Sequence, residues 1–174
     1  MIRSKARIRG LFRVVCRSRL TDAFKWEEIF PNGVVNVGLD DLLETYFNQL
    51  AQHANFYMGG IEGAGPVLAA TDTMGAHAGW TEWGDGGGAD DYDEVTRPEW
   101  NPGAAAGQQV TNVAPVVFTG NASQIVSGIF IATDDTKGGA GGILWATGLF
   151  AQGDKNVDDD DVLEVTYTVT AADA

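Results

Sequence analysis

Hydrophobic and polar residues alternate most regularly near the C-terminus, in residues 162–170. One face of this segment carries Leu163, Val165, Tyr167 and Val169, and the other carries Glu164, Thr166, Thr168 and Thr170. Alternation with a period of two is typical of a half-buried antiparallel strand. The segment therefore predicts a strand with one face toward a core, and such a strand needs neighbours from elsewhere in the chain.

Two further strands are expected shortly before this one, joined by a glycine-rich turn. Ile125–Thr133 and Ile143–Phe150 are rich in apolar and β-branched residues, whereas residues 134–142 between them have the composition of a turn. An acidic loop then leads into residues 162–170. The last third of the chain accordingly predicts three strands around which the rest is organised.

The N-terminal residues alternate over a longer stretch, with basic residues on one side. Every basic residue up to position 19 has an odd number: Arg3, Lys5, Arg7, Arg9, Arg13, Arg17 and Arg19. The even positions from Ala6 to Cys16 are apolar or glycine, and Leu11 and Val15 are the exceptions on the basic side. This pattern predicts one long strand. Its arginine face has two interpretations, a solvated face that blunts an exposed edge or an arm that pairs with an acidic neighbour.

One helix is expected in the middle of the chain, over residues 40–52. Its apolar positions recur at three- and four-residue spacing: Leu39, Leu42, Leu43, Tyr46, Phe47 and Leu50. Shorter strands are expected at Phe24–Phe30, Asn55–Ile61 and Gln109–Thr119. Residues 62–106 have no regular pattern and contain Trp80, Trp83 and Trp100, and a loop this long is normally functional or an interface.

Together these elements predict a mainly β protein, a jelly-roll-like antiparallel β-sandwich with one short α-helix and a long irregular loop. We expect residues 1–25 to form a basic N-terminal strand or arm and residues 26–174 to form a single sandwich domain. The sequence has no stretch of eighteen apolar residues and no visible signal peptide, so no membrane partner is expected. Its one cysteine, Cys16, is expected to be buried.

Charge changes this picture because it is segregated along the chain. The first 25 residues contain eight of the eleven Lys and Arg residues and one acidic residue, a net charge of +7. The remaining 149 residues carry −20, which gives −13 for the whole chain. An acidic body is repelled by phosphate backbones, so nucleic acid is not expected as a partner, and acidic protein surface is the expected partner of the basic strand.

Candidate catalytic chemistry is sparse. His53 and His77 have no second ligand at metal-binding spacing, no serine lies in a nucleophile elbow, and no glycine-rich loop has a phosphate-binding pattern. Two acidic clusters, within residues 85–94 and 154–161, are interpreted as solvated loops in preference to Ca²⁺ sites. Glu82 between Trp80 and Trp83 is a weak indication of glycoside hydrolysis. We therefore expect no enzymatic activity, no cofactor and no structural metal.

Several segments resemble a family of small structural proteins of tailed bacteriophages. They are Trp26–Gly38, Asn55–Ile61, Thr96–Trp100 and the stretch from Gly128 through Leu144 to Thr170, in this order. The resemblance implies a virion component assembled in the host cytoplasm: a capsid decoration (cement) protein, a head-fibre base or a small tail component. It also implies a β-sandwich that works by burying surface against its neighbours. The basic strand lies outside the matching region.

The expected function is therefore structural, with the major capsid protein or other virion proteins as partners and a homo-oligomer, a trimer being favoured. The residues expected to contact partners are Arg3, Lys5, Arg7, Arg9, Arg13, Arg17, Arg19, Trp80, Trp83 and Trp100. Two alternatives stay open. One is a carbohydrate-binding, host-recognition module in a tail or head fibre, in which Trp80, Trp83, Trp100 and Tyr92 would stack on sugars. The other is a hydrolase that uses Glu82.

Overall fold

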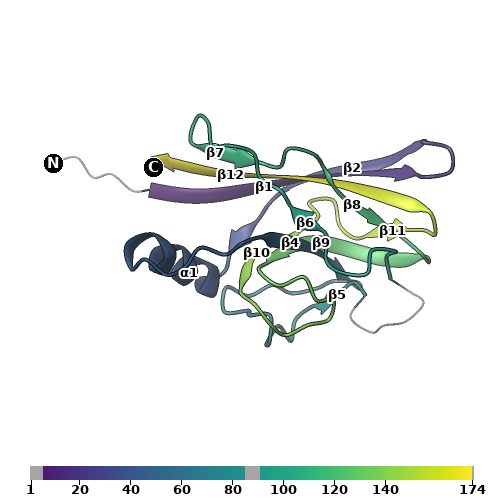
Figure 1. Ribbon diagram of the computed structural model, residues 1–174. Helices are drawn as coiled ribbons and strands as arrows, with labels where there is room; N and C mark the ends of the chain where they lie inside the picture. The colour runs from purple at the N-terminus through teal and green to yellow at the C-terminus, as the bar shows by residue number, and fades with distance from the viewer. Residues whose placement is uncertain (1–5, 85–90, 174) are drawn as a thin grey trace.

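A computed structural model describes residues 6–84 and 91–173, which form two antiparallel β-sheets packed face to face, with one helix (Figure 1). In chain order the elements are β1 (Ala6–Ser18), β2 (Phe24–Pro31), β3 (Gly33–Val34), α1 (Asn36–Phe47), β4 (Phe56–Glu62), β5 (Thr81–Glu82), β6 (Glu99–Trp100), β7 (Gln109–Thr111), β8 (Val116–Thr119), β9 (Gln124–Ala132), β10 (Leu144–Leu149), β11 (Lys155–Val157) and β12 (Asp161–Asp173). The predicted fold class is confirmed: a mainly β antiparallel sandwich with one short helix and a long irregular loop.

The first sheet is built around the two ends of the chain. Its strand order is β2-β1-β12-β7, and β8 also pairs with β12. β1 and β12 pair along all thirteen residues of β1, from Ala6 opposite Asp173 to Ser18 opposite Asp161. Residues 6–18 of the basic N-terminal segment are therefore a strand of the sandwich, paired with β12 along its whole length and with β2 from Leu11 onward.

The second sheet is covered on its outer side by the long loop. Its strand order is β3-β10-β9-β4-β5, with β11 paired to β9 and β6 paired to β4. Phe130 and Ala132 of β9 pack with Met74 and Trp80 from the loop, while Ile129 faces the first sheet. Because β9 is buried on both faces from Val126 onward, most of its sequence is apolar and does not alternate.

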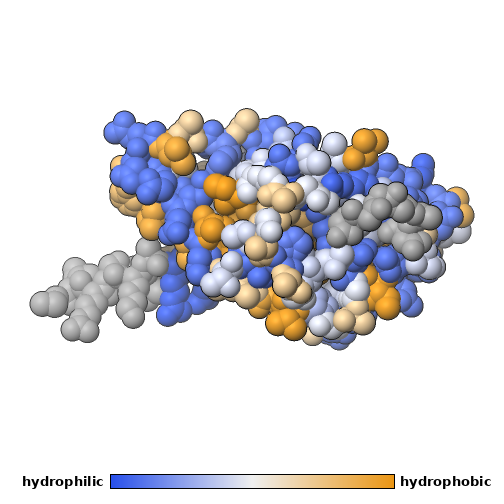
Figure 2. All heavy atoms as spheres, turned by 90° about the horizontal axis from the view of Figure 1, so that it is seen from below, coloured by the Kyte–Doolittle hydropathy of each residue, from blue (hydrophilic) through white to orange (hydrophobic). Residues whose placement is uncertain are grey.

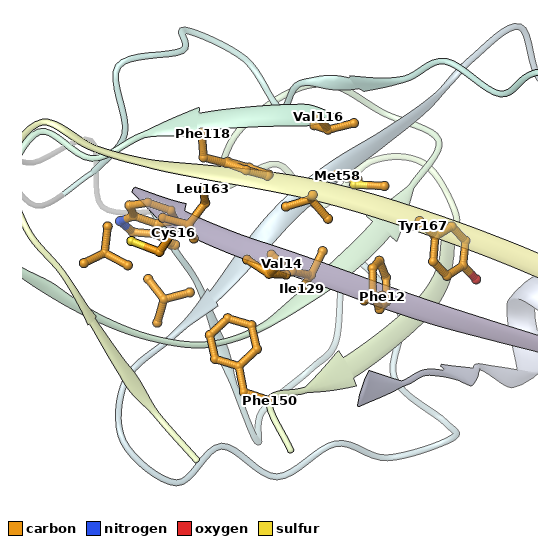
Figure 3. Packing of buried hydrophobic residues seen from close by; sticks show 14 of the residues in the cluster. Phe12, Val14, Cys16, Met58, Val116, Phe118, Ile129, Phe150, Leu163 and Tyr167 are labelled. Carbon is orange, nitrogen blue, oxygen red and sulfur yellow. The ribbon is translucent and has the colours of Figure 1, made fainter. Parts of the chain in front are cut away.

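The main core lies between the sheets. Phe12, Val14 and Cys16, even-numbered residues of β1, are fully buried in one cluster with Ile129 and Met58 of the second sheet, and Figure 3 shows Val14 next to Ile129. This burial confirms the period-two prediction for the N-terminal strand. Burial also raises the pKa of the Cys16 thiol to about 12, so the cysteine behaves as a small apolar side chain.

Some element boundaries differ from the sequence prediction. α1 begins at Asn36 and ends at Phe47, earlier at both ends than expected, and the backbone of Gln49 has a positive φ of 59°, which is incompatible with a continuing helix. The expected strand Gln109–Thr119 is interrupted and forms β7 and β8. β5 and β6 lie in the segment predicted to be irregular, and β11 lies in the acidic loop.

Candidate interaction surface

The most distinctive surface feature is the apolar side of α1, which faces solvent. Leu39 is 40% exposed, Leu43 53%, Tyr46 78% and Phe47 70%, and Leu50 just beyond the helix is 51% exposed. We call these five residues the α1 stripe. Figure 2 shows apolar groups at the end of the molecule where Figure 1 places α1. An amphipathic helix on a globular protein ordinarily turns its apolar side toward the core, and α1 has the opposite orientation.

The inward side of α1 explains this orientation, because its two buried positions are a glycine and a carboxylate. Gly38 and Asp41 are the buried residues of the helix. Gly38 lies so close to β10 that an added Cβ atom would be 2.5 Å from the carbonyl oxygen of Trp145. Asp41 is held from the other side by His53, with 2.8 Å between Oδ1 and Nε2. The helix is thus attached through a glycine, a carboxylate and the partly buried Val37, whereas the five side chains of the α1 stripe are exposed.

The arginine side of β1 forms a second candidate surface on the outer face of the first sheet. Arg13 contacts Glu27 at 2.6 Å, Arg17 approaches Glu164 at 3.7 Å, and Arg19 lies 3.4 Å from Asp93. These three arginines are thus partly neutralised by neighbouring strands and loops of the same chain.

Arg7 and Arg9 differ from the other arginines of β1. Both are exposed and form no ion pair with the residues that the structure describes. Arg3 and Lys5 lie outside the described residues. The basic charge still open to a partner on β1 is therefore that of Arg7 and Arg9.

The tryptophans expected to contact partners are buried. Trp83 is fully buried, and Trp80 and Trp100 are less than a tenth exposed. Trp80 stacks on His77 with 3.9 Å between ring centroids, and Trp83 packs edge to face with buried Tyr92 at 5.1 Å. Their burial removes the shared stacking platform expected for Trp80, Trp83, Trp100 and Tyr92, although Trp100 also lines the pocket described below.

Glu82, the candidate catalytic acid, is also in the interior. Arg97 binds it bidentately, with Nε and Nη2 each 2.7 Å from one carboxylate oxygen, and both side chains are almost completely buried. Arg97 further donates to the carbonyl oxygens of Asp134 and Gly139. The pair joins the long loop to the β9–β10 connection, which is a structural role that sequence spacing alone did not indicate.

The acidic loop before β12 is bound by cations of the same chain. Lys25 Nζ lies 2.7 Å from Asp158 and 2.5 Å from Asp161, and Arg19 lies 3.5 Å from Asp160. The hydrogen bond from Lys25 holds the pKa of Asp158 below its usual range. Over residues 6–84 and 91–173, no group of three or more His, Cys, Asp or Glu side chains is arranged to hold a metal ion. Asp85 and Asp90 of the other acidic cluster lie outside the described residues.

A pocket between α1 and the sandwich is a further candidate site, one that the sequence did not reveal. Its volume is about 570 Å³, and its wall combines aromatic rings with polar groups. Phe56 lies 6.2 Å from Trp100 and 6.1 Å from Trp145, measured between ring centroids. Gln52 and Asn101 also line the pocket. Trp145 lies in an apolar strand pattern, so only the fold could show that it meets Phe56.

Comparisons with known proteins add no relative. A scan against models of protein families and a search of curated proteins both find no match. Within the residues described, α1 is neither long nor apolar enough to span a membrane.

Proposed function

We propose that this protein is a non-enzymatic structural component of a tailed-bacteriophage virion, a capsid decoration protein that stabilises the head through contacts with the major capsid protein and with its own copies. Several segments resemble such proteins in the same order along the chain, which suggests a location in the virion. The α1 stripe supports a function based on contacts with other proteins. In this proposal the protein is located in the virion, and neither nucleic acid nor a membrane is its partner.

The observation that carries this proposal is the inverted orientation of α1. Contiguous exposed apolar side chains are typical of sites that another macromolecule covers. Aromatic residues such as Tyr46 and Phe47 are also the residue types that anchor protein interfaces. A stable interface buries about 1,200–2,000 Å² in total, so the stripe would be the centre of a larger contact area.

The test uses purified particles of a phage whose genome encodes this chain. Antibodies against the recombinant protein, detected by immunogold electron microscopy, should label the head in many copies. A phage carrying Leu43→Ser and Phe47→Ser should lose most of the protein from its heads. Leu20→Ser is the matched control, since Leu20 is 78% exposed and belongs to the β1–β2 connection at the opposite end of β1 from α1.

Two results would contradict the proposal. One is absence of the protein from purified particles. The other is full retention of the Leu43→Ser, Phe47→Ser variant with unchanged thermal stability of the heads. Labelling confined to the tail would favour the fibre or tail role over the decoration role.

The pocket beside α1 supports a second candidate function, carbohydrate recognition by a tail or head-fibre component. Aromatic rings next to side-chain amides are a combination that suits sugar binding, because the rings pack on apolar ring faces and the amides bind hydroxyl groups. A glycan screen should then give a signal that falls when Gln52 and Asn101 are replaced by alanine. Absence of binding to any surface glycan of the bacterial host would remove this candidate.

A further inference from the structure

We infer that the α1 stripe is covered by a second copy of this chain, whose docking site is the groove beside Arg9 and Leu11 on the first sheet. This inference rests on the proposed function and names the partner of one surface. The contact between copies is then head to tail, because the helix of one copy binds in the groove of the next.

The groove lies where β2 ends and β1 continues alone on that side. β1 pairs with β2 only from Leu11 onward, so residues 6–10 extend past the end of β2. The groove has a volume of about 490 Å³ and is lined by β1, by Pro31 and Asn32, and by Thr168 and Thr170 of β12. Leu11 within it is 48% exposed, and Ile29, its diagonal neighbour on β2, is 52% exposed. The groove can therefore receive an apolar side chain such as Phe47.

The two surfaces carry opposite charges around their apolar centres. The α1 stripe is flanked by exposed Asp40 and Glu44, and the sequence from residue 36 to residue 50 contains no Lys or Arg. The groove is flanked by Arg7 and Arg9, which have no acidic partner among the described residues. Facing charges of opposite sign favour this pairing and fix its orientation.

The same charges argue against the symmetric alternative, in which two α1 stripes pack on each other. That arrangement would bring Asp40 and Glu44 of one copy against the same carboxylates of the other, and such like-charge contacts are costly. Two grooves facing each other would likewise oppose arginines. Only the pairing of stripe with groove satisfies both surfaces.

The pairing cannot form within one chain as it is folded here. No residue of α1 lines the groove. Arg9, Leu11, Thr168 and Thr170 share the outer face of the first sheet, whereas α1 lies beside β10 of the second sheet. A contact between different surfaces of identical chains closes into a ring or continues as a filament. A trimer is one such closed ring.

The experiment measures the assembly state of the purified full-length protein by analytical ultracentrifugation, without phage particles. The wild-type protein should form an oligomer at micromolar concentration that dissociates as salt increases. Phe47→Ser, in the stripe, and Arg9→Glu, in the groove, should each give monomers. Both positions are exposed, so the variants should stay folded, with the circular dichroism spectrum of the wild type, and Leu20→Ser should assemble like the wild type.

Mixing the two variants distinguishes head-to-tail contact from symmetric contact. The Arg9→Glu protein keeps an intact stripe and the Phe47→Ser protein keeps an intact groove, so their mixture should form a one-to-one dimer and no larger species. Symmetric helix pairing would instead leave Arg9→Glu alone as an oligomer and give no mixed dimer, which would overturn the inference.

The failure of this inference and the failure of the proposed function give different results. A wild-type monomer that still decorates phage heads through α1 would overturn the inference and leave the function standing. A head-to-tail oligomer that is absent from particles would overturn the proposed function and leave the contact between copies standing.

Discussion

Phe12 and Arg9 are three residues apart on β1 and face opposite sides of the first sheet. Phe12 stacks on Tyr167 with 4.4 Å between centroids and on Phe30 with 5.2 Å, and it is fully buried. Arg9 is exposed on the outer face. A substitution of Phe12 should therefore cost much more than one of Arg9, while odd-numbered Val15 is an exception because it is only 4% exposed.

Replacing Phe12 with alanine should lower the free energy of unfolding by about 3–5 kcal/mol, because it leaves a cavity beside the rings of Tyr167 and Phe30. Val14→Ala should also destabilise the protein. Arg7→Ala and Arg9→Ala should each change the free energy of unfolding by less than about 0.5 kcal/mol. Urea unfolding followed by tryptophan fluorescence measures all four, and equal losses would contradict the period-two assignment.

Arg97 shows a different single-residue effect, that of a buried charge. Arg97→Met should destabilise the protein by about 3–5 kcal/mol, because it leaves the Glu82 carboxylate buried without a cation. The double variant Arg97→Met, Glu82→Leu should recover much of this loss, since neither charge remains.

Arg13→Met is the control for the Arg97 variants. It removes an ion pair with Glu27 that is largely exposed, so its cost should be below about 1 kcal/mol. A cost of Arg97→Met as small as that of Arg13→Met would show that the buried pair does not hold the long loop.

At the level of elements, the sequence predicted the strands whose burial is visible in their own alternation of apolar and polar residues. β1 and β12 face a core on one side only, so their alternation identified both strands and the buried side chains. β5, β6 and β11 are two or three residues long and are defined by their partners on β4 and β9. No local pattern can predict strands of that kind.

The candidate surface was predicted only in part, for a related physical reason. The spacing from Leu39 to Leu50 indicated an amphipathic helix, but periodicity does not tell which side faces the protein. That choice is decided by Gly38 against β10 and by the contact of Asp41 with His53, which are tertiary contacts. Likewise, the pattern around Trp80 could not show that the ring is buried by Phe130, fifty residues away.

The contact of Lys25 on β2 with the acidic loop makes the stability of the fold depend on pH. Hydrogen bonds to Asp158, the larger cause, and to Asp161 raise the pKa of Lys25, and the bond from Lys25 lowers the pKa of Asp158. The lysine stabilises the fold below its unfolded pKa of about 10 and loses this effect as the pH rises through its folded value. The aspartate stabilises the fold above its unfolded pKa of about 4 and loses this effect as the pH falls through its folded value.

Lys25→Met should therefore lower the melting temperature most between about pH 5 and pH 9, where both groups are charged in the folded and unfolded chains. The difference from the wild type should narrow below about pH 4, as Asp158 becomes protonated. Arg7→Met, which removes a charge without an ion pair in the described structure, should show no such dependence. A pH-independent difference for Lys25→Met would contradict the role of this contact.

On the scale of the whole molecule, the charge is less segregated in space than in sequence. Arg13, Arg17, Arg19 and Lys25 of the basic segment all contact acidic residues from other parts of the chain. The fold thus uses much of the N-terminal charge internally, against a net charge of −13 for the chain.

The full-length protein should consequently fail to retard duplex DNA in an electrophoretic assay at about 0.15 M salt, where the Debye length is about 8 Å. Arg9→Glu should behave in the same way. A retarded band that weakens as salt increases and disappears with Arg9→Glu would show that Arg9 binds nucleic acid and not a protein surface.

The pairing of β1 with β12 also has a consequence for synthesis of the protein. β1 is made before the other described strands and its long-range partner β12 after them, so the first sheet cannot be completed until β12 has left the ribosome. Phe12, Val14 and Cys16 stay uncovered while the strands of the second sheet are being made. An apolar strand with a free edge is prone to aggregation during this interval. The nascent chain should therefore benefit from chaperones that cover exposed strands until β12 has been made.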